Sequence, residues 1–480
     1  MSISNLMNET TIARGNRLYQ DYRDRWQYLL ESYVGGEAYR DGSHLQRYQL
    51  ETESEYQARL RNAHLDNHCS SVVSIYNSFL FKSSPVRELG ILDGQGYTED
   101  FLRDADRDGT NFNNFMKDVA TWSSVFGAVW IMVSKPNVSA LTLADELATG
   151  VRPYVSLLTP LNVLDFTYER SIDGSYHLTY FRYLEEYIED LQVIKEWTPD
   201  TITTYVYDME NDVVQVEEEV DNGLGKIPAV ICYNKKTNVR GIGIGDLNDI
   251  ADCQRFIYNM QNELEQTIRL DSHPSLVCTP ETITGNGAGS IIQIPESMDP
   301  QLKPYLLQYG GASADSILKS IASTVESIDK MANVGSIRGT EARRMSGVAQ
   351  EQEFQLLAAK LSEKGDNLEL CEEHIWKLFA EYQGQTFNGE IVYPDSYNIR
   401  DIHNEYVQLK TARDTATDPR VLSVIDRELV VLLGHEPDEV LAEADFVPHI
   451  MRNAEGEMMM ANTQEEHQAL MALRYTHLED

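Results

Sequence analysis

Long apolar runs, paired cysteines and basic residues are all scarce in this sequence of 480 residues. The most apolar stretch, residues 125–133 (VFGAVWIMV), is about half the roughly 18 residues that a membrane span requires, so it predicts a buried strand or a core helix. The start of the chain has no apolar segment behind basic residues, so we expect no secretory signal. The five cysteines are scattered and odd in number, which argues against a disulfide framework and favours folding in a reducing cytoplasm.

Basic side chains are outnumbered, because 40 Lys and Arg stand against 76 Asp and Glu, a formal net charge of −36. A conventional DNA-binding protein uses a basic surface to release phosphate counterions, and this chain cannot do so over its whole surface. Charge alone leaves two interpretations open. The chain is either an ordinary acidic soluble protein or one whose acidic wall repels a duplex that moves past it.

Motifs for catalysis and nucleotide binding are also missing. The sequence contains no G-x-x-x-x-G-K-[ST], H-E-x-x-H, C-x-x-C or G-x-S-x-G, and the glycine spacing of GIGIGD at 241–246 indicates a hinge. Carboxylates are so frequent that no single pair stands out as a general acid and base. We therefore expect no enzymatic activity and no cofactor.

Two small clusters could hold a metal ion in principle. His64 and His68, next to Cys69, would lie at i and i+4 on one face of a helix, which is compatible with zinc. A second pair of ligands is missing nearby, so a structural pair is favoured. Cys371 and His374 share one helical turn inside an apolar seam, and burial in a helix interface explains them more simply. We expect no metal site.

Apolar periodicity predicts an α+β protein that is mainly helical. Helical spacing marks residues 10–34, 54–82 and 110–125. From 151 to 233, short stretches rich in β-branched and aromatic residues alternate with turn signals, which predicts an antiparallel sheet with one solvent-exposed face.

Two apolar-striped helices flank a short proline-broken insertion. The first helix, 246–270, follows the glycine-rich hinge, and the second, 313–332, has apolar side chains three and four residues apart in a heptad-like seam. The insertion, 271–312, contains the strand-like pieces SLVCT and SIIQI. A seam of this kind needs a partner surface, which is either the preceding helix or a neighbouring subunit.

Helical patterns dominate the rest of the chain. Residues 333–347 (NVGSIRGTEARRMSG) are polar, broken by glycine and carry three arginines against one glutamate. A long helix is predicted from 348 to 383, with a kink where Lys364-Gly365 interrupts the apolar pattern. A strand at 391–394 follows, and further helices are predicted at 400–413, 419–433, 437–444 and 463–478.

The order of these elements resembles the portal proteins of tailed bacteriophages over about residues 25–440. Stretches similar to the family in character are WQYLLESYVGGEAYR (26–40), RLRNAHLDNHCSSVVSIYNSFLFKSSPV (59–86), Phe126-Gly127 through Val133 and Pro136, GIGIGDLNDIADCQRFIYNMQNEL (241–264) and MSGVAQEQEFQLLAAKL (345–361). The resemblance implies a portal-type architecture with these parts: a wing (1–245), stem helices (246–270 and 313–332), an α/β clip (271–312), a tunnel loop (333–347), a long kinked helix with a return strand of the wing (348–399), and a helical crown with a C-terminal tail (400–480).

The same resemblance implies a function and partners. About twelve identical subunits would form a ring near 650 kDa at one capsid vertex, with a channel for packaging and ejection of double-stranded DNA. The implied partners are the terminase large subunit, which carries the packaging ATPase, the head–tail adaptor and tail proteins, and the major capsid or scaffold protein. DNA would be bound without base readout, and no membrane is implied. The expected location is the virion, after assembly in the host cytoplasm.

Acidic residues of the two stem helices would then line the channel, and the arginines of 333–347 would project into it. Those arginines would either contact phosphate transiently or pair with acids of neighbouring subunits, and both readings stay open. The candidate acids are Asp249, Asp252, Glu263, Glu265, Asp315, Glu326 and Asp329, and the candidate arginines are Arg338, Arg343 and Arg344.

Other classes of protein compete with this interpretation. A different ring-forming virion component, such as an adaptor, is usually much shorter and lacks a helix pair that flanks an insertion. An acidic metal-dependent hydrolase or nuclease would need carboxylates clustered at strand ends, whereas the acids here lie mainly on helix faces. A helical scaffold is disfavoured because the sequence has no internal repeat.

Overall fold

The computed structural model describes residues 15–41, 43–136, 150–272, 275–277, 299, 305–307, 311–338, 347–394, 397, 402–416, 419–432, 449–452, 458–461 and 476–477. The chain divides into two compact units, residues 1–397 and 398–480, named unit 1 and unit 2. Helices and antiparallel sheets are both present, so the predicted α+β class is confirmed.

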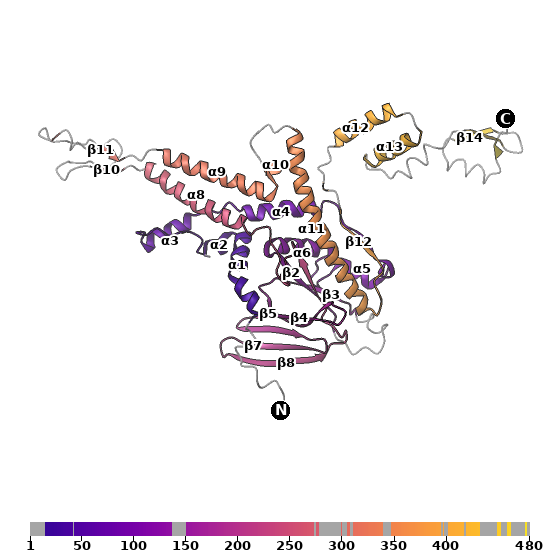
Figure 1. Ribbon diagram of the computed structural model, residues 1–480, viewed down its shortest axis with the longest axis horizontal. Coiled ribbons are helices and arrows are strands. Elements are labelled where there is room, and N and C mark those ends of the chain that lie inside the picture. The colour runs from indigo at the N-terminus through magenta and orange to yellow at the C-terminus, as the bar shows by residue number, and fades with distance from the viewer. Residues whose placement is uncertain are drawn as a thin grey trace. The chain divides into compact units, whose positions relative to one another are not determined.

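Unit 1 begins with short helices (Figure 1). Helix α1 (Arg17–Val34) starts after Asn16, whose side chain accepts the amide hydrogen of Leu18. It ends at Gly35, whose φ of +67° favours glycine, as the sequence predicts. The elements that follow are α2 (Gly36–Asp41), α3 (Glu53–Asn62), α4 (His68–Leu80), the 3₁₀ helix η3 (Gly90–Leu92), α5 (Gly96–Arg103) and α6 (Phe112–Phe126).

The single helix predicted over 54–82 is wrong, because the chain forms α3 and α4 with five non-helical residues between them. Ala63 is extended, and the side chain of Asn67 caps α4 by accepting the amide hydrogen of Ser70 at 2.8 Å. The Asn67 amide also donates to the carbonyl of Tyr33 at 2.9 Å. A side chain that caps a helix and ties it to α1 therefore outweighs the continuous apolar pattern.

Two antiparallel sheets form the part of unit 1 that lies lowest in Figure 1. The apolar run at 125–133 ends α6 and becomes the fully buried strand β2 (Ala128–Ser134), which lies between β3 (Tyr154–Leu158) and β9 (Ala229–Tyr233). The second sheet is a five-stranded meander, and it confirms the sheet predicted between 151 and 233. Its strands, in order, are β4 (Val163–Arg170), β5 (Tyr176–Ile188), β6 (Leu191–Trp197), β7 (Thr201–Asp208) and β8 (Val213–Asp221).

Aromatic side chains join the two sheets to α1. Trp130 of β2 lies 5.3 Å from Phe166 and 4.9 Å from Phe181, ring centroid to ring centroid, and all three are buried. The Trp130 indole donates to the hydroxyl of Tyr19, which in turn donates to the carbonyl of Gly241. The glycine-rich hinge is thus fixed to the core at the point where the chain leaves the sheets.

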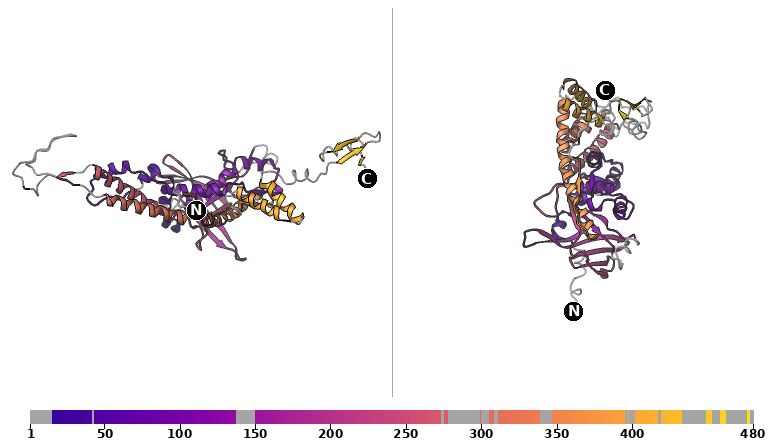
Figure 2. Two further views of the ribbon diagram at one scale, coloured as in Figure 1. Left: turned by 90° about the horizontal axis from the view of Figure 1, so that it is seen from above. Right: turned by 90° about the vertical axis from the view of Figure 1, so that its right-hand side faces the viewer.

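The helix pair predicted around the insertion is present. Helix α8 (Ile250–Ser272) and helix α9 (Ala312–Ala332) lie side by side in both views and extend from the rest of unit 1 (Figures 1 and 2). At their far end, β10 (Ser275–Val277) pairs antiparallel with β11 (Tyr305–Leu307), which confirms a strand at SLVCT. The SIIQI piece lies outside the described residues.

A short helix, α10 (Gly335–Arg338), follows α9, and the long helix α11 (Gly347–Tyr382) crosses the body of unit 1. The helical backbone of α11 continues through Lys364 and Gly365. A side chain at Gly365 would meet the Tyr397 hydroxyl at 2.7 Å, so glycine allows this close approach. Strand β12 (Glu390–Val392), predicted at 391–394, pairs with β1 (Val86–Glu88).

Unit 2 contains helices α12 (Ile402–Thr415) and α13 (Pro419–Leu432), close to two of the predicted helices. In the C-terminal tail, β13 (His449–Arg452) pairs with β14 (Met458–Ala461) and with β15 (Thr476–His477), so the helix predicted over 463–478 is wrong at its described residues. Strand β15 lies in the predicted helix 463–478. Alternating side chains in HIMR and MMMA pair across the two strands, which local helical spacing could not reveal. The predicted helix 437–444 lies outside the described residues.

Candidate functional site: the helix pair and the ion cluster at its base

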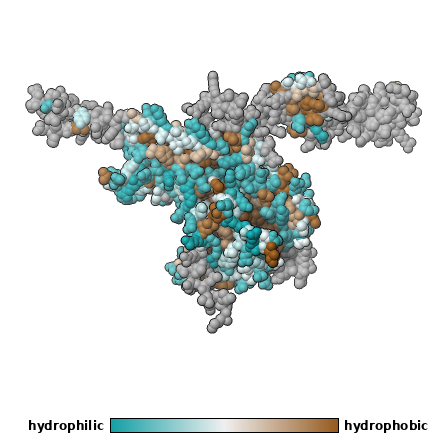
Figure 3. All heavy atoms as spheres, viewed as in Figure 1, coloured by the Kyte–Doolittle hydropathy of each residue, from teal (hydrophilic) through white to brown (hydrophobic). Residues whose placement is uncertain are grey.

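The apolar seam of the helix pair is buried at its base and open toward its far end. Ile328 and Ala332 of α9 are fully buried near the body. Toward the strand-bearing end, Leu318 of α9 is 50% exposed and Ile268 of α8 is 52% exposed. Brown, apolar residues interrupt the teal surface over the helix pair (Figure 3). The two helices therefore cover each other only in part.

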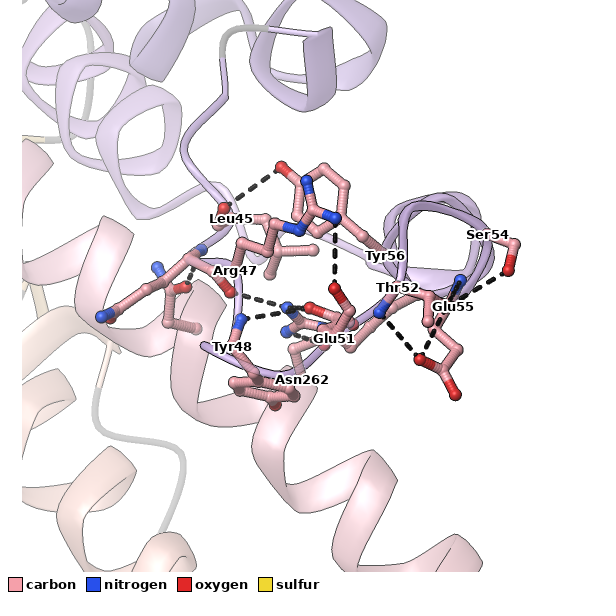
Figure 4. Close-up of polar contacts among 12 residues, drawn as sticks. Leu45, Arg47, Tyr48, Glu51, Thr52, Ser54, Glu55, Tyr56 and Asn262 are labelled. Carbon is pink, nitrogen blue, oxygen red and sulfur yellow. Dashed lines mark hydrogen bonds and ion pairs between the residues drawn. The ribbon is translucent and has the colours of Figure 1, made fainter.

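A second set of contacts supports α8 from the amino-terminal side. Arg59 of α3 is 4% exposed, and its guanidinium donates to Glu51 through two bonds of 2.8 Å and to the side chain of Asn262 on α8 at 2.9 Å. The guanidinium also lies 3.9 Å from the ring centroid of Tyr48. Figure 4 shows Tyr48 and Glu51 close to Asn262 of α8, next to the capping box in which Thr52 and Glu55 begin α3. The middle of α8 is thereby joined to α3 through a buried, charge-assisted hydrogen bond.

A buried ion cluster, formed by Asp246, Lys360 and Lys364, lies at the base of the helix pair. Asp246 ends the glycine-rich hinge, four residues before α8, and both lysines lie on α11. Its carboxylate is 2.6 Å from the Nζ atom of Lys364 and 3.0 Å from that of Lys360. Lys364 also donates to the hydroxyl of Ser124 at 2.9 Å and to the side-chain oxygen of Asn234.

Opposing effects set the ionisation of this cluster. Burial alone would raise the pKa of Asp246, but the ammonium groups of Lys364 and Lys360 hold that pKa below its ordinary value. Burial lowers the pKa of Lys364, whereas Asp246 raises the pKa of Lys360 above its ordinary value. A carboxylate shared by two ammonium groups satisfies the charges that the fold removes from water.

Hydrogen bonds connect this cluster to both helices of the pair. The Tyr76 hydroxyl accepts from Lys360 at 2.8 Å and donates to the carbonyl of Ala332, the last residue of α9, at 2.7 Å. The backbone amide of Asp246 donates to the carbonyl of Ser124 on α6 at 2.8 Å. The start of α8 and the end of α9 are thus joined through α11, and a cavity of about 430 Å³ lies beside this junction.

The predicted channel acids differ in how they are placed. Asp249 and Asp315 are exposed, whereas Asp252 is bound by Arg25 through two contacts of 3.1 Å. Three others form ion pairs within the chain: Glu265 with Arg269 at 2.5 Å, Glu326 with Lys330 at 3.1 Å, and Asp329 with Arg338 at 3.0 Å. Glu263 is half-buried. Much of the negative charge predicted for these helices is therefore balanced locally.

Arg338 forms contacts that neither sequence-based alternative anticipates. Its guanidinium pairs with Asp329 of its own chain and lies 2.6 Å from the Nδ1 atom of His68. The side chain is 17% exposed, so it closes the turn between α9 and α10 instead of extending outward. Arg343 and Arg344 lie outside the described residues.

The two candidate metal clusters differ in how well the predicted spacing holds. His64 is exposed in the segment between α3 and α4, and His68 is the first residue of α4, so the shared helical face is wrong. Burial, and then Arg338, lower the pKa of His68. Cys371 is buried beside Cys232, as its apolar seam predicts. Among the residues that the structure describes, no group of three or more His, Cys, Asp or Glu could hold a metal ion, and no helix could cross a membrane.

Sequence reasoning missed the ion cluster, although one signal for it was visible. The polar residue Lys364 interrupts the apolar stripe of α11, and the interruption was interpreted as a kink. A lysine inside an otherwise apolar stripe is also the sign of a buried ion pair, but its partner Asp246 lies 118 positions earlier. Only the fold brings the two together.

No protein-family model and no curated protein matches the chain. Similar solved structures come from gene transfer agent (GTA) particles. The neck of an empty particle, computed with C6 symmetry, has 12% identity and a TM-score of 0.44, covering 84% of this chain and 100% of that chain. The virion of a native particle has 11% sequence identity and a TM-score of 0.43. The neck of a native particle, computed with C12 symmetry, has 10% identity and a TM-score of 0.40. Each match covers 85% of this chain and 99% of the other chain. These scores are below 0.5, so the functional proposal rests on the residues and their geometry.

Proposed function

We propose that this chain is a non-enzymatic subunit of a phage-like head–tail connector and, within that class, a portal protein. About twelve copies would form a ring at one capsid vertex, through which double-stranded DNA is packaged and ejected. Terminase and the adaptor and tail proteins would dock on the ring. The sequence resemblance to portal proteins and the order of sheets, helix pair, short helix and long helix both support this proposal.

The observation that carries the proposal is the incomplete burial of the helix pair. Leu318 and Ile268 near its far end, together with Phe256 and Met331 nearer the body, are between 41% and 52% exposed. Covering the exposed half of such a side chain contributes about 1 kcal/mol. Two extended helices that leave apolar side chains open along their length are suited to packing against copies of themselves around an axis.

The charges of α8 and α9 support a channel that binds DNA only weakly. The 23 residues of α8 and 21 residues of α9 contain both acids and bases, and several of these pair with each other. A wall with small net negative charge and few unpaired cations offers a duplex little to bind. DNA could then slide along it, because phosphate contacts are the main source of non-specific affinity.

The test is the mass and shape of the purified protein. We expect a stable particle near 650 kDa by native mass spectrometry, about twelve times the 54.6 kDa of one chain. Negative-stain images should show a toroid with a central hole. A monomer or dimer that persists at all protein and salt concentrations would refute the ring. A compact particle without a hole would refute the channel.

A further inference from the structure

A groove of about 590 Å³ is lined by strand β9 and helix α11, which contact each other beside it. On the side of the strand, the groove is lined by Ala229, Ile231 and Tyr233. The helix contributes one face, with residues spaced three or four apart from Asn367 to Glu381. Leu370 on this face is 57% exposed, so the groove offers apolar surface to solvent.

Strand β9 has an open backbone edge along this groove. In the three-stranded sheet, β9 pairs with β2 on one side, and no described strand pairs with its other side. An open edge presents a row of amide and carbonyl groups, and an extended segment can add to it as a further strand. The groove is therefore shaped for an extended polypeptide.

The charge of the groove restricts which polypeptide fits. Four cations line it: Lys226, Lys236, Arg240 and Lys377. Lys226 forms an ion pair with Glu381, and Lys377 lies 2.7 Å from a carboxylate oxygen of Glu373 on the same helix. Lys236 and Arg240 lie over tyrosine rings, and their positive charges are available to a partner. This is a local excess of positive charge on a chain whose net charge is −36. An acidic extended segment complements it, and a neutral or basic one does not.

Strand β8 supplies a segment of that kind on the same chain. It is the edge strand of the five-stranded sheet and is exposed along most of its length. Its centre carries Glu217, Glu218 and Glu219, all exposed, beside a bulge in its pairing with β7. Three like charges oppose pairing of β8 with another β8, but they do not oppose pairing with a basic acceptor.

We infer that strand β8 of one copy docks in the β9–α11 groove of the next copy. The two surfaces differ, so the contact is head-to-tail, and head-to-tail contacts close into rings when the rotation between copies allows it. This inference rests on the proposed ring and adds the surfaces that hold neighbours together outside the helix pair. The carboxylates of β8 would face the cations at the rim of the groove.

The experiment uses charge reversal in the full chain. The groove variant carries Lys236→Glu and Arg240→Glu, and the strand variant carries Glu217→Lys, Glu218→Lys and Glu219→Lys. A third protein combines all five changes. The matched controls are Lys82→Glu, an exposed lysine that lines neither cavity, and Glu210→Lys in the turn before β8. Mass photometry over a range of protein and salt concentrations gives the concentration at which half of the chains are in rings, and circular dichroism checks the fold.

Each single-surface variant should need at least about tenfold more protein to assemble, because like charges then face each other across the contact. The combined variant should recover to near the wild-type value, and the controls should assemble normally. Wild-type assembly should also weaken as salt screens the contact.

The possible failures separate the two proposals. A wild-type protein that never forms rings overturns the proposed function itself. Rings that tolerate both reversals overturn only the β8–groove contact. A groove variant that fails while the strand variant assembles normally shows that another acidic segment fills the groove, which overturns the assignment of β8.

Discussion

At the scale of single residues, the ion cluster shows how a few side chains fix a junction between distant parts of the chain. Asp246 holds two ammonium groups that come from neighbouring turns of α11. Removing one partner of a buried ion pair leaves the other charge without compensation, and this typically costs about 3–5 kcal/mol. The cluster therefore matters more for stability than the many exposed ion pairs of this protein, which contribute about 0–1 kcal/mol each.

We expect Asp246→Asn to lower the stability of unit 1 by about 3–5 kcal/mol, because Lys364 is left buried without a carboxylate. Calorimetry on the purified protein measures this as a lower melting temperature for the transition of unit 1. Asp249→Asn is the matched control, since Asp249 is exposed and its replacement should change stability by less than about 0.5 kcal/mol. Equal melting temperatures for the two variants would contradict the role of the cluster.

The same variant predicts a pH dependence whose sign follows from the lowered pKa of Asp246. A carboxyl with a lowered folded-state pKa stabilises the protein above its unfolded pKa of about 3.9, and this stabilisation is lost as the pH falls through the folded value. The gap in melting temperature between wild type and Asp246→Asn should thus be full at neutral pH and shrink below about pH 4. A gap that is constant or grows in acid would rule out the ionised carboxylate.

At the scale of elements, the helix pair combines a fixed base with an open end. Hydrogen bonds and the buried part of the seam hold α8 and α9 near the body, whereas toward the strands β10 and β11 the seam is half exposed. The half of the helix pair at its base is buried and contributes to the fold of one chain. Its outer half is available for contacts between chains.

We expect the double change Leu318→Ser and Ile268→Ser to weaken ring assembly while the single chain stays folded. Each side chain would lose about 1 kcal/mol of burial at every contact between copies. Analytical ultracentrifugation compares the mass distribution with that of Lys319→Ser, an exposed neighbour on the same helix. If both proteins assemble alike, the exposed seam does not contact a neighbouring copy.

The element order was predictable from sequence to a useful degree, and the exceptions have physical causes. Apolar spacing located α6, α8, α9 and α11, and β-branched stretches located most of the meander. The gap between α3 and α4 escaped because a capping asparagine decides it, and strand β4 escaped because VLDFTYER has no clean alternation. Strand β15 depends on pairing with β13, a contact that no local window contains.

At the scale of the whole molecule, the net charge of −36 is distributed differently from the expectation. The sequence placed the acidic surface on the helix pair, but bases there and on α1 and α10 neutralise several of those carboxylates. Strand β8 instead carries an exposed run of glutamates. Counting charges along the chain could not separate these surfaces, because the neutralising partner of Asp252 is Arg25, 227 positions away.

The three arginines of 333–347, for which the sequence left phosphate contact and pairing between subunits both open, should behave differently from one another. Arg343→Glu with Arg344→Glu should leave ring mass unchanged and reduce DNA packaged per head, measured by nuclease protection in an in vitro packaging reaction. Arg338→Glu should instead lower the melting temperature of unit 1, because it places a carboxylate opposite Asp329. Rings that fail to form in the double variant would favour pairing between subunits over contact with phosphate.

The junction at the base of the helix pair also has a mechanical consequence. Helix α9 has 21 residues, so it reaches about 30 Å from its base at 1.5 Å per residue. A force at the far end of α9 would turn the helix about its fixed base. At this base the hydroxyl of Tyr76 joins the last carbonyl of α9 to Lys360. A small lateral force at the far end of the helix pair would therefore produce a torque on the long helix α11. A partner that binds at that end would thus act mechanically on the elements that α11 contacts.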